Sequence, residues 1–207
     1  ALSNSPNAAV RVIYAGDTGA EVSNPSVAPN GKRVVFGTTV RGKPTIAVIG
    51  LDGANLTLLG EGLDPEWHPS KDLVVFHRYV SGHMQIFMID ANTGTNLVQL
   101  TSGDSGSAYA GWSPTGDYIV FASNRGWNTI KGASHGETMN LFLIKPDGTG
   151  LIQLTSGNVA STMPAWGKDG WIYFVSDQMG NGDVWRLRPA TELLEPDSPG
   201  AADGESP

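Results

Sequence analysis

The sequence contains no cysteine, no long apolar run and no excess of basic residues, and each absence excludes a class of protein. Without cysteine, the 207 residues form no disulfide and offer no thiolate to a metal ion. No apolar stretch approaches the roughly 20 residues that cross a bilayer as a helix, so we expect no membrane insertion. The lack of a basic excess argues against a nucleic-acid partner.

The net charge of −7 is concentrated near one end of the sequence. Residues 190–207 read "ATELLEPDSPGAADGESP", with five acidic side chains and no basic one. Without this stretch, 15 acidic residues stand against 13 basic ones, which is close to neutral. Because so acidic and proline-rich a stretch has little apolar surface to bury, we expect residues 190–207 to form a flexible tail.

The rest of the chain, with 27 glycines and 13 prolines, is built from four copies of one pattern. The clearest copy is "YAGWSPTGDYIVFASNR", and its counterparts are "SNPSVAPNGKRVVFGTTV", "LDPEWHPSKDLVVFHRYV" and "TMPAWGKDGWIYFVSDQM". An apolar run ends in each copy at an equivalent phenylalanine: Phe36, Phe76, Phe121 and Phe174. Turn signals such as "PDGTG" separate further apolar runs, as is typical of short antiparallel strands.

Each copy predicts a meander of four strands that cannot bury both of its faces alone, so the copies must stack on one another. Radial stacking gives an all-β fold, a four-bladed β-propeller of four-stranded antiparallel blades. We expect a propeller domain over residues 10–189, after an N-terminal extension of residues 1–9. The repeats are expected at 23–62, 63–103, 104–157 and 158–189. The last repeat has no fourth strand, so we expect the strand 10–16, "VRVIYAG", to complete the last blade and close the ring. Two alternatives stay open: a piece of a larger propeller, and an arc completed by a second copy.

One inner-strand position carries Trp67, Trp112 and Trp166, with Val27 in the first repeat. Large aromatic side chains at a repeated strand position are typical of a core. We therefore predict that these tryptophans pack between neighbouring blades.

The repeats resemble the TolB-type propeller repeat (PD40, WD40-like), which is related to the WD repeat and to the propeller domains of prolyl-oligopeptidase-like peptidases. The resemblance rests on "WSPTGDYIVFASNR" and "LFLIKPDGTGLIQLT" and covers about residues 10–188. It implies a propeller fold and, for many relatives, a periplasmic or secreted location. TolB itself has six blades and a separate N-terminal α/β domain, and this chain departs from it in both respects.

No catalytic constellation is apparent in the sequence, so we expect a protein that is not an enzyme. Ser105 in "GDSGSAYAG" has no histidine or aspartate motif before it of the kind that a serine nucleophile requires. No cofactor is predicted, although a metal ion in the central channel stays open as an alternative. Its candidate ligands are the carboxylates of the blade-to-blade loops, which equally suit local turn hydrogen bonds: Asp17, Glu21, Asp64 and Asp104.

One loop is ten residues longer than its counterparts: "SNRGWNTIKGASHGETMN", residues 123–140. In a propeller meander this loop opens on the same face as the blade-to-blade loops, and loops on a rigid scaffold often carry binding residues. The loop holds a tryptophan beside basic residues, a combination enriched at binding hot spots. We predict that the partner contacts come from this loop and its shorter counterparts: Trp127, Arg125, Lys131, His135, Arg41, Arg78 and His83.

The sequence thus favours a non-catalytic binding or scaffolding module for a protein or glycan partner. Two alternatives belong to other classes: a hydrolase with a metal ion in the channel, like the propeller lactonases, and a structural subunit of a larger assembly. A tryptophan loop that folds back to cover its own blade is the competing explanation for the long insertion.

Overall fold

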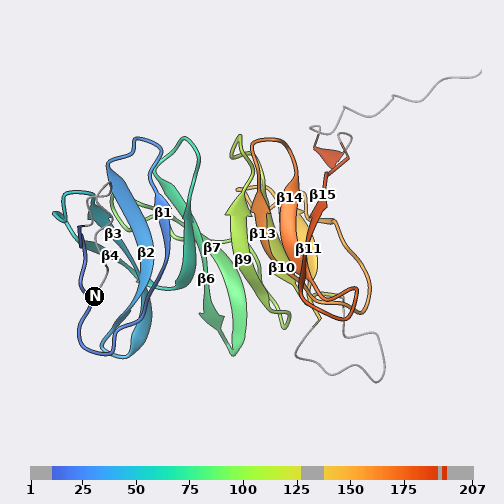
Figure 1. The fold of residues 1–207 in the computed structure, drawn as a ribbon, viewed down its shortest axis with the longest axis horizontal. Coiled ribbons are helices and arrows are strands. Elements are labelled where there is room, and N and C mark those ends of the chain that lie inside the picture. The colour runs from blue at the N-terminus through green and yellow to red at the C-terminus, as the bar shows by residue number, and fades with distance from the viewer. Residues whose placement is uncertain (1–10, 127–137, 191–192, 195–207) are drawn as a thin grey trace, which may run out of the picture.

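The computed structural model describes residues 11–126, 138–190 and 193–194, and it shows an all-β protein (Figure 1). Its strands form four antiparallel sheets that follow one another along the chain, three with four strands and one with three. No α-helix is present in these residues, and they contain no helix long and apolar enough to cross a membrane. The sequence-based prediction of antiparallel, propeller-like meanders is therefore confirmed.

Each sheet is formed by consecutive strands. The first sheet contains β1 (Val22–Val27), β2 (Arg33–Val40), β3 (Lys43–Gly50) and β4 (Thr57–Glu61). The second contains β5 (Leu63–Trp67), β6 (Leu73–Val80), β7 (His83–Asp90) and β8 (Val98–Gln99). The third contains β9 (Ser107–Trp112), β10 (Ile119–Ser123), β11 (Asn140–Ile144) and β12 (Ile152–Gln153). The fourth contains β13 (Ser161–Trp166), β14 (Ile172–Ser176) and β15 (Asp183–Leu187).

Tight turns set the register of the longest hairpins. Val40 pairs with Lys43 across the two-residue turn Arg41-Gly42, in which both residues have positive φ, 51° and 77°. This conformation is that of the turn whose twist matches a β-hairpin, and glycine adopts it without steric strain. Because side chains alternate along a strand, fixing this register also fixes which residues face each neighbouring sheet.

The core consists of repeated contacts between one sheet and the next. The second and third sheets each direct one set of alternate side chains toward the following sheet and the other set toward the preceding sheet. Between the first and second sheets, for example, Val35 and Ile46 of the first sheet pack against Val74, Phe76 and Phe87 of the second. The second and third sheets repeat this arrangement, as do the third and fourth.

The tryptophans predicted to lie between blades do so. Trp67 packs between the first and second sheets and Trp112 between the second and third, and each is nearly fully buried. Trp166 packs, half-buried, between the third and fourth. Val27, at the same position in β1, is 57% exposed because the described residues form no sheet beyond the first one.

The predicted closure of the ring is wrong for the described residues. The first and last sheets lie at opposite ends of an open row (Figure 1), and the last sheet has three strands, β13, β14 and β15. Segment 11–16 belongs to no sheet. Its Ile13 and Tyr14 instead pack on the outer face of the first sheet, with the Tyr14 ring 4.7 Å from that of Phe36.

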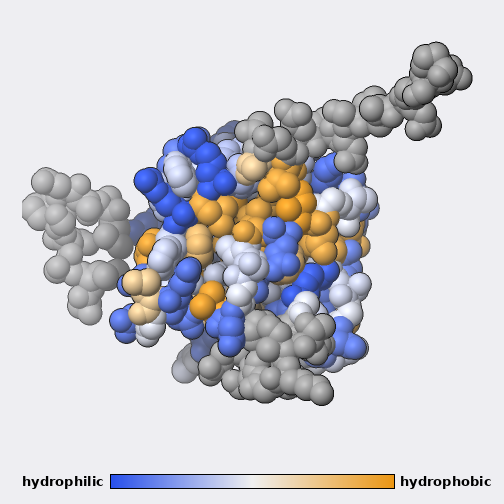
Figure 2. All heavy atoms as spheres, turned by 90° about the vertical axis from the view of Figure 1, so that its right-hand side faces the viewer, coloured by the Kyte–Doolittle hydropathy of each residue, from blue (hydrophilic) through white to orange (hydrophobic). Residues whose placement is uncertain are grey.

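The predicted closure failed because an apolar pattern does not specify which surface buries it. The alternation in "VRVIYAG" shows that side chains need burial, but it does not say which sheet will cover them. The open face of the first sheet is the nearest apolar surface along the chain, and Ile13 and Tyr14 reach it. At the other end, apolar side chains gather on the exposed side of the last sheet (Figure 2), where Val184 is 78% exposed.

Candidate functional site

The innermost strand of every sheet contains a β-bulge at the same place. The ladders of β1, β5, β9 and β13 each shift register there. One residue of each bulge has positive φ although none is glycine: Asn24 (49°), Asp64 (48°), Tyr109 (56°) and Met163 (51°). Such strained backbone costs about 1–2 kcal/mol per residue and is common where a strand re-aims a side chain at a functional site.

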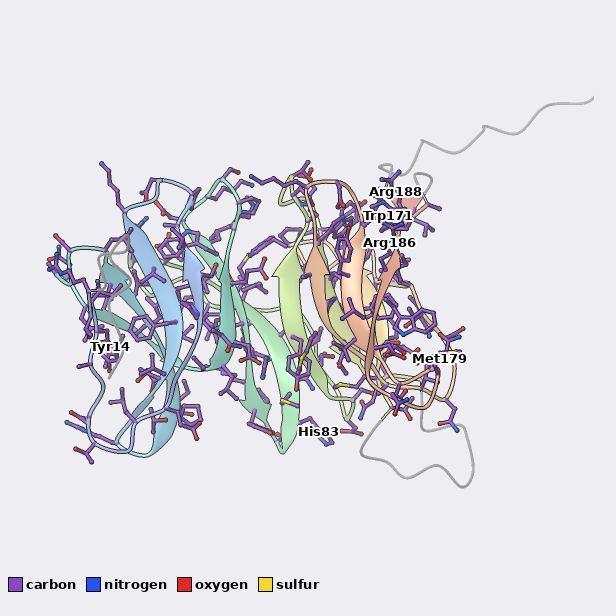
Figure 3. The ribbon with its side chains drawn as sticks, in the orientation of Figure 1. Tyr14, His83, Trp171, Met179, Arg186 and Arg188 are labelled. Atoms are coloured by element: carbon purple, nitrogen blue, oxygen red, sulfur yellow. The ribbon has the colours of Figure 1, made fainter. Side chains whose placement is uncertain are left out.

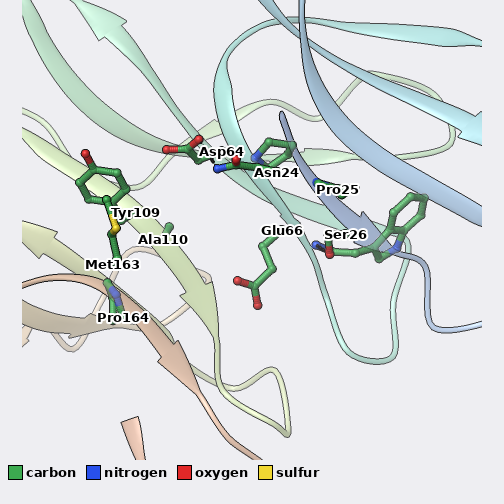
Figure 4. Close-up of a pocket in the computed structure, with 11 residues that line it drawn as sticks. Asn24, Pro25, Ser26, Asp64, Glu66, Tyr109, Ala110, Met163 and Pro164 are labelled. Carbon is green, nitrogen blue, oxygen red and sulfur yellow. Dashed lines mark hydrogen bonds between the residues drawn. The ribbon is translucent and has the colours of Figure 1, made fainter. Parts of the chain in front are cut away.

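The four bulge residues line one open groove of about 640 Å³ between the inner strands (Figure 4). Tyr109 and Met163 supply apolar surface, and Met163 is 58% exposed. Residues that follow the bulges complete the lining: Pro25, Ser26, Pro65, Glu66, Trp67, Ala110 and Pro164. The groove is thus built from all four sheets, with rigid, partly apolar walls.

The groove has an acidic character. Asp64 accepts a hydrogen bond of 2.5 Å from the Asn24 amide, and its other carboxylate oxygen lies 3.8 Å from His77 Nε2. Burial lowers the pKa of His77, so this ring is neutral at pH 7 and leaves the Asp64 charge uncompensated. Glu66 accepts a hydrogen bond of 3.1 Å from the Trp112 backbone, while burial raises the pKa of its carboxyl group. None of the described residues that line the groove is basic.

His77 makes stability depend on pH. Its folded pKa lies below the ordinary value of 6.5, so the unfolded chain binds the proton more readily. The free energy of unfolding should therefore fall as the pH drops below about 6.5, by up to about 1.4 kcal/mol per pH unit for such a group. Asp64, the charged group facing the ring, opposes this shift without reversing it. Buried His68, whose pKa is also lowered by burial, adds to the effect.

We expect the His77→Gln variant to lose part of the decrease in unfolding free energy between pH 7 and pH 5, measured by urea denaturation. His68, whose pKa is lowered in the same direction, should keep another part of the decrease in the variant. An unchanged pH profile in the variant would contradict this assignment.

The residues predicted to contact a partner are only partly described. Arg41 is exposed in the β2–β3 turn, and His83 is half-buried at the start of β7 (Figure 3). The guanidinium carbon of Arg78 lies over the Phe87 ring, 4.1 Å from its centroid. Arg125 is half-buried 6.0 Å from the Phe142 ring. Three further predicted contacts lie outside the described residues: Trp127, Lys131 and His135.

The ends of the long loop lie beside blade-to-blade loops, as the propeller geometry predicts. Met139 accepts a backbone hydrogen bond of 2.7 Å from Ser161, and Thr138 lies 3.4 Å from the Asn158 side chain. In the second sheet, Gln85 donates hydrogen bonds to the carbonyl groups of Gly103 and Ser105. We call this end of the molecule, where hairpin turns and blade-to-blade loops meet, the loop face.

The structure does not bring the four metal candidates together. Only Asp64 lines the groove, whereas Asp17, Glu21 and Asp104 are exposed and do not line it. Among residues 11–126, 138–190 and 193–194, no three histidine, aspartate or glutamate side chains are grouped as a metal site requires. Asp17 lies at the start of a turn in which its backbone carbonyl accepts a hydrogen bond from the Ala20 N–H.

Sequence reasoning missed Asn24, Tyr109 and Met163. A signal was nevertheless present, because the position three residues before the repeated tryptophan carries four unlike residues in four otherwise similar repeats. A position that varies within an otherwise regular repeat is not needed for packing, so its side chains are free to serve binding. The left-handed backbone at these residues, which glycine usually provides, could not be expected from their types.

Comparison with known proteins bears on the fold. No protein-family model matches the sequence. A TolB-type protein from Agrobacterium tumefaciens superposes with a TM-score of 0.63 at 22% identity, over 75% of this chain and 54% of that one. TolB from Acinetobacter baumannii gives 0.59 at 18% identity, over 82% of this chain and 44% of that one. An oligogalacturonate lyase in complex with manganese superposes with a TM-score of 0.54 at 17% identity, over 86% of this chain and 56% of that one.

The chain therefore spans about half the length of the proteins it resembles. Propeller peptidases are also among the similar structures, so both TolB proteins and enzymes share this architecture. At these identities the likeness concerns the fold alone, and one fold serves many functions. The sheets of this chain have the fold of a TolB-like β-propeller.

Proposed function

We propose that this chain is a non-catalytic β-propeller binding module whose groove holds a segment of a protein partner. The observation that supports the proposal best is the set of four equivalent bulges, which direct four unlike side chains into one open groove. Bulges and strained backbone of this kind are common where a strand re-aims a side chain at a functional site, which supports a binding role for the four positions.

The chemistry of the groove favours a basic partner segment. Asp64 carries an uncompensated charge, and the groove has no basic side chain among its described residues. Tyr109 and Met163 offer the aromatic and thioether surface that is enriched at protein interfaces. A lysine or arginine flanked by apolar residues would match both properties.

The long loop adds a second part to the proposed site. Residues 123–140 begin and end on the loop face, and Trp127, Arg125, Lys131 and His135 are proposed to contact the same partner. The likeness to TolB supports an extracytoplasmic setting, which is part of the proposal. A glycan partner is the alternative that an experiment must separate from a protein partner.

Arrays of short peptides and of glycans, probed with the labelled full chain, test this function. We expect retention on peptides that contain lysine or arginine, weakening as salt is raised because charge attraction is screened. The Asp64→Asn variant should lose roughly tenfold in affinity for these peptides, which corresponds to about 1.4 kcal/mol. Asp117→Asn, at an exposed carboxylate in the turn between β9 and β10 and outside the groove, is the matched control and should bind normally. Binding to glycans alone would refute the protein partner.

A further inference from the structure

The two ends of the row of sheets are complementary. Toward the preceding sheet, the second sheet directs Val74, Phe76, Phe87 and Ile89, and the third and fourth sheets use the equivalent positions. The first sheet carries the same set, Val34, Phe36, Ala47 and Ile49, and among the described residues Ile13 and Tyr14 pack on it and help to bury it. On the same face Val22 and Val27 stay 53% and 57% exposed. This exposed apolar surface could receive a sheet that the described residues do not supply.

Segment 11–16 occupies the place of a fourth strand that belongs to such a preceding sheet. In the chain, Leu59, Leu100 and Leu154 lie in or just after the fourth strands, and each packs on the following sheet. Aligning "VRVIYAG" with "LVQLTSG" and "LIQLTSG" puts Ile13 at the position of Leu100 and Leu154. Ile13 makes the equivalent contact, because it packs on the receiving face of the first sheet.

The last sheet lacks this strand. In the third sheet, the Leu141 carbonyl accepts a hydrogen bond of 2.8 Å from the Leu154 backbone, and the Leu141 N–H donates to Thr155. The equivalent residue of the last sheet is Val184, in the edge strand β15, and no outer strand pairs with β15 among the described residues. After β15 the chain turns away, and the Leu194 carbonyl accepts a hydrogen bond from Tyr118.

The polar groups at the two ends also match. At the first junction, Arg33 stacks on Trp67 and donates a 2.6 Å hydrogen bond to Asn92 of the second sheet. The position of Asn92 is occupied in the first sheet by Asp52. On the last sheet, Arg186 and Arg188 stack on Trp171, which stands at the position of Arg33 (Figure 3). The guanidinium groups of Arg186 and Arg188 on the last sheet would thus face the carboxylate of Asp52 on the first sheet of another copy.

We infer that a second copy of this chain docks head to tail on the first, and that segment 11–16 of each copy forms the missing fourth strand beside β15 of the other. The junction repeats the three sheet-to-sheet contacts already present within one chain. Two copies use it twice and close a ring of eight sheets, which is within the range of known propellers. This inference does not depend on what the groove binds.

Single cysteines test the junction directly, since the natural chain has none. Leu141 and Leu154 lie opposite each other in the third sheet, so Ile13 and Val184 should lie opposite each other across the junction. Opposed residues in antiparallel strands have Cα atoms about 4.5–5.5 Å apart, which a disulfide can bridge. Mixing the Ile13→Cys and Val184→Cys proteins under air oxidation should give a linked dimer. Mixing Leu97→Cys, exposed on the outer side of the second sheet, with Val184→Cys should give none.

Native mass spectrometry of the unmodified 207-residue chain supplies an independent readout. We expect a species of twice the 21.8 kDa of one chain. A single-chain mass together with no cross-link in the mixture would overturn the inference. So would a chain carrying both cysteines that links within itself and keeps the mass of one copy, because the ring would then close without a partner. A ladder of larger masses would refute the two-copy ring.

Discussion

Replacing Phe121 with alanine is expected to lower the free energy of unfolding by about 3–5 kcal/mol, the usual loss for a buried phenylalanine. Phe121 is fully buried between the second and third sheets and stacks on Phe142 at 5.9 Å. Its removal would leave a cavity between the second and third sheets. Each of these sheets also packs on another neighbour, so they cannot easily move together to fill the cavity. Urea denaturation followed by tryptophan fluorescence would measure the change.

Phe121→Leu is the matched control for this experiment. Leucine keeps most of the apolar volume, so the expected loss is about 1–1.5 kcal/mol. If alanine and leucine destabilised the protein equally, the contact between the second and third sheets would not be the close-packed core described above.

Gly116→Ala is expected to destabilise the protein by about 3 kcal/mol, the sum of a backbone and a steric effect. Gly116 has a φ of +80°, which L-residues rarely adopt, and an added Cβ would collide with the His68 ring. That ring cannot easily move, because its Nδ1 accepts hydrogen bonds from the backbone of Ser70 and Lys71 at 3.0 Å. It also lies edge-on to Trp112, with centroids 4.5 Å apart.

Gly31→Ala separates the two effects. Gly31 occupies the equivalent turn of the first sheet with a φ of +65°, and its added Cβ would meet no atom within 4 Å. We therefore expect only the backbone penalty of about 1 kcal/mol. Equal losses for the two variants, measured by urea denaturation, would show that contact with His68 contributes nothing.

The repeat pattern predicted the sheets well because it encodes packing. Equivalent phenylalanines and tryptophans recur where each sheet contacts the next, and both periodicity and residue size are visible in a sequence. Closure of the ring was different, since it depends on which surface covers a short apolar segment. The alternation of residues 10–16 is compatible with any open edge or face, and the structure places Ile13 on the first sheet.

The candidate site was predicted only in part. Asp64 was predicted only as a candidate metal ligand in a blade-to-blade loop, whereas the structure places it in β5, where it lines the groove. Its partners could not be identified from residue types, because Tyr109 and Met163 would fit a core equally well. Their role follows from a backbone feature, the bulge with positive φ, that non-glycine sequences do not reveal. The uncompensated charge of Asp64 depends in turn on the burial of His77, because burial keeps that ring neutral. The other three repeats have no histidine at this position, so the repeat pattern did not indicate its role.

The most direct test of the proposed function is the dissociation constant of an array-selected basic peptide for three forms of the full chain, measured by titration calorimetry. The forms are the natural chain, Tyr109→Ala in the groove and Leu97→Ala outside it, where Leu97 is 44% exposed. We predict a loss of roughly tenfold or more for Tyr109→Ala, as for an aromatic interface residue, and no change for Leu97→Ala. Equal affinities for all three forms would contradict the assignment of this groove as the binding site.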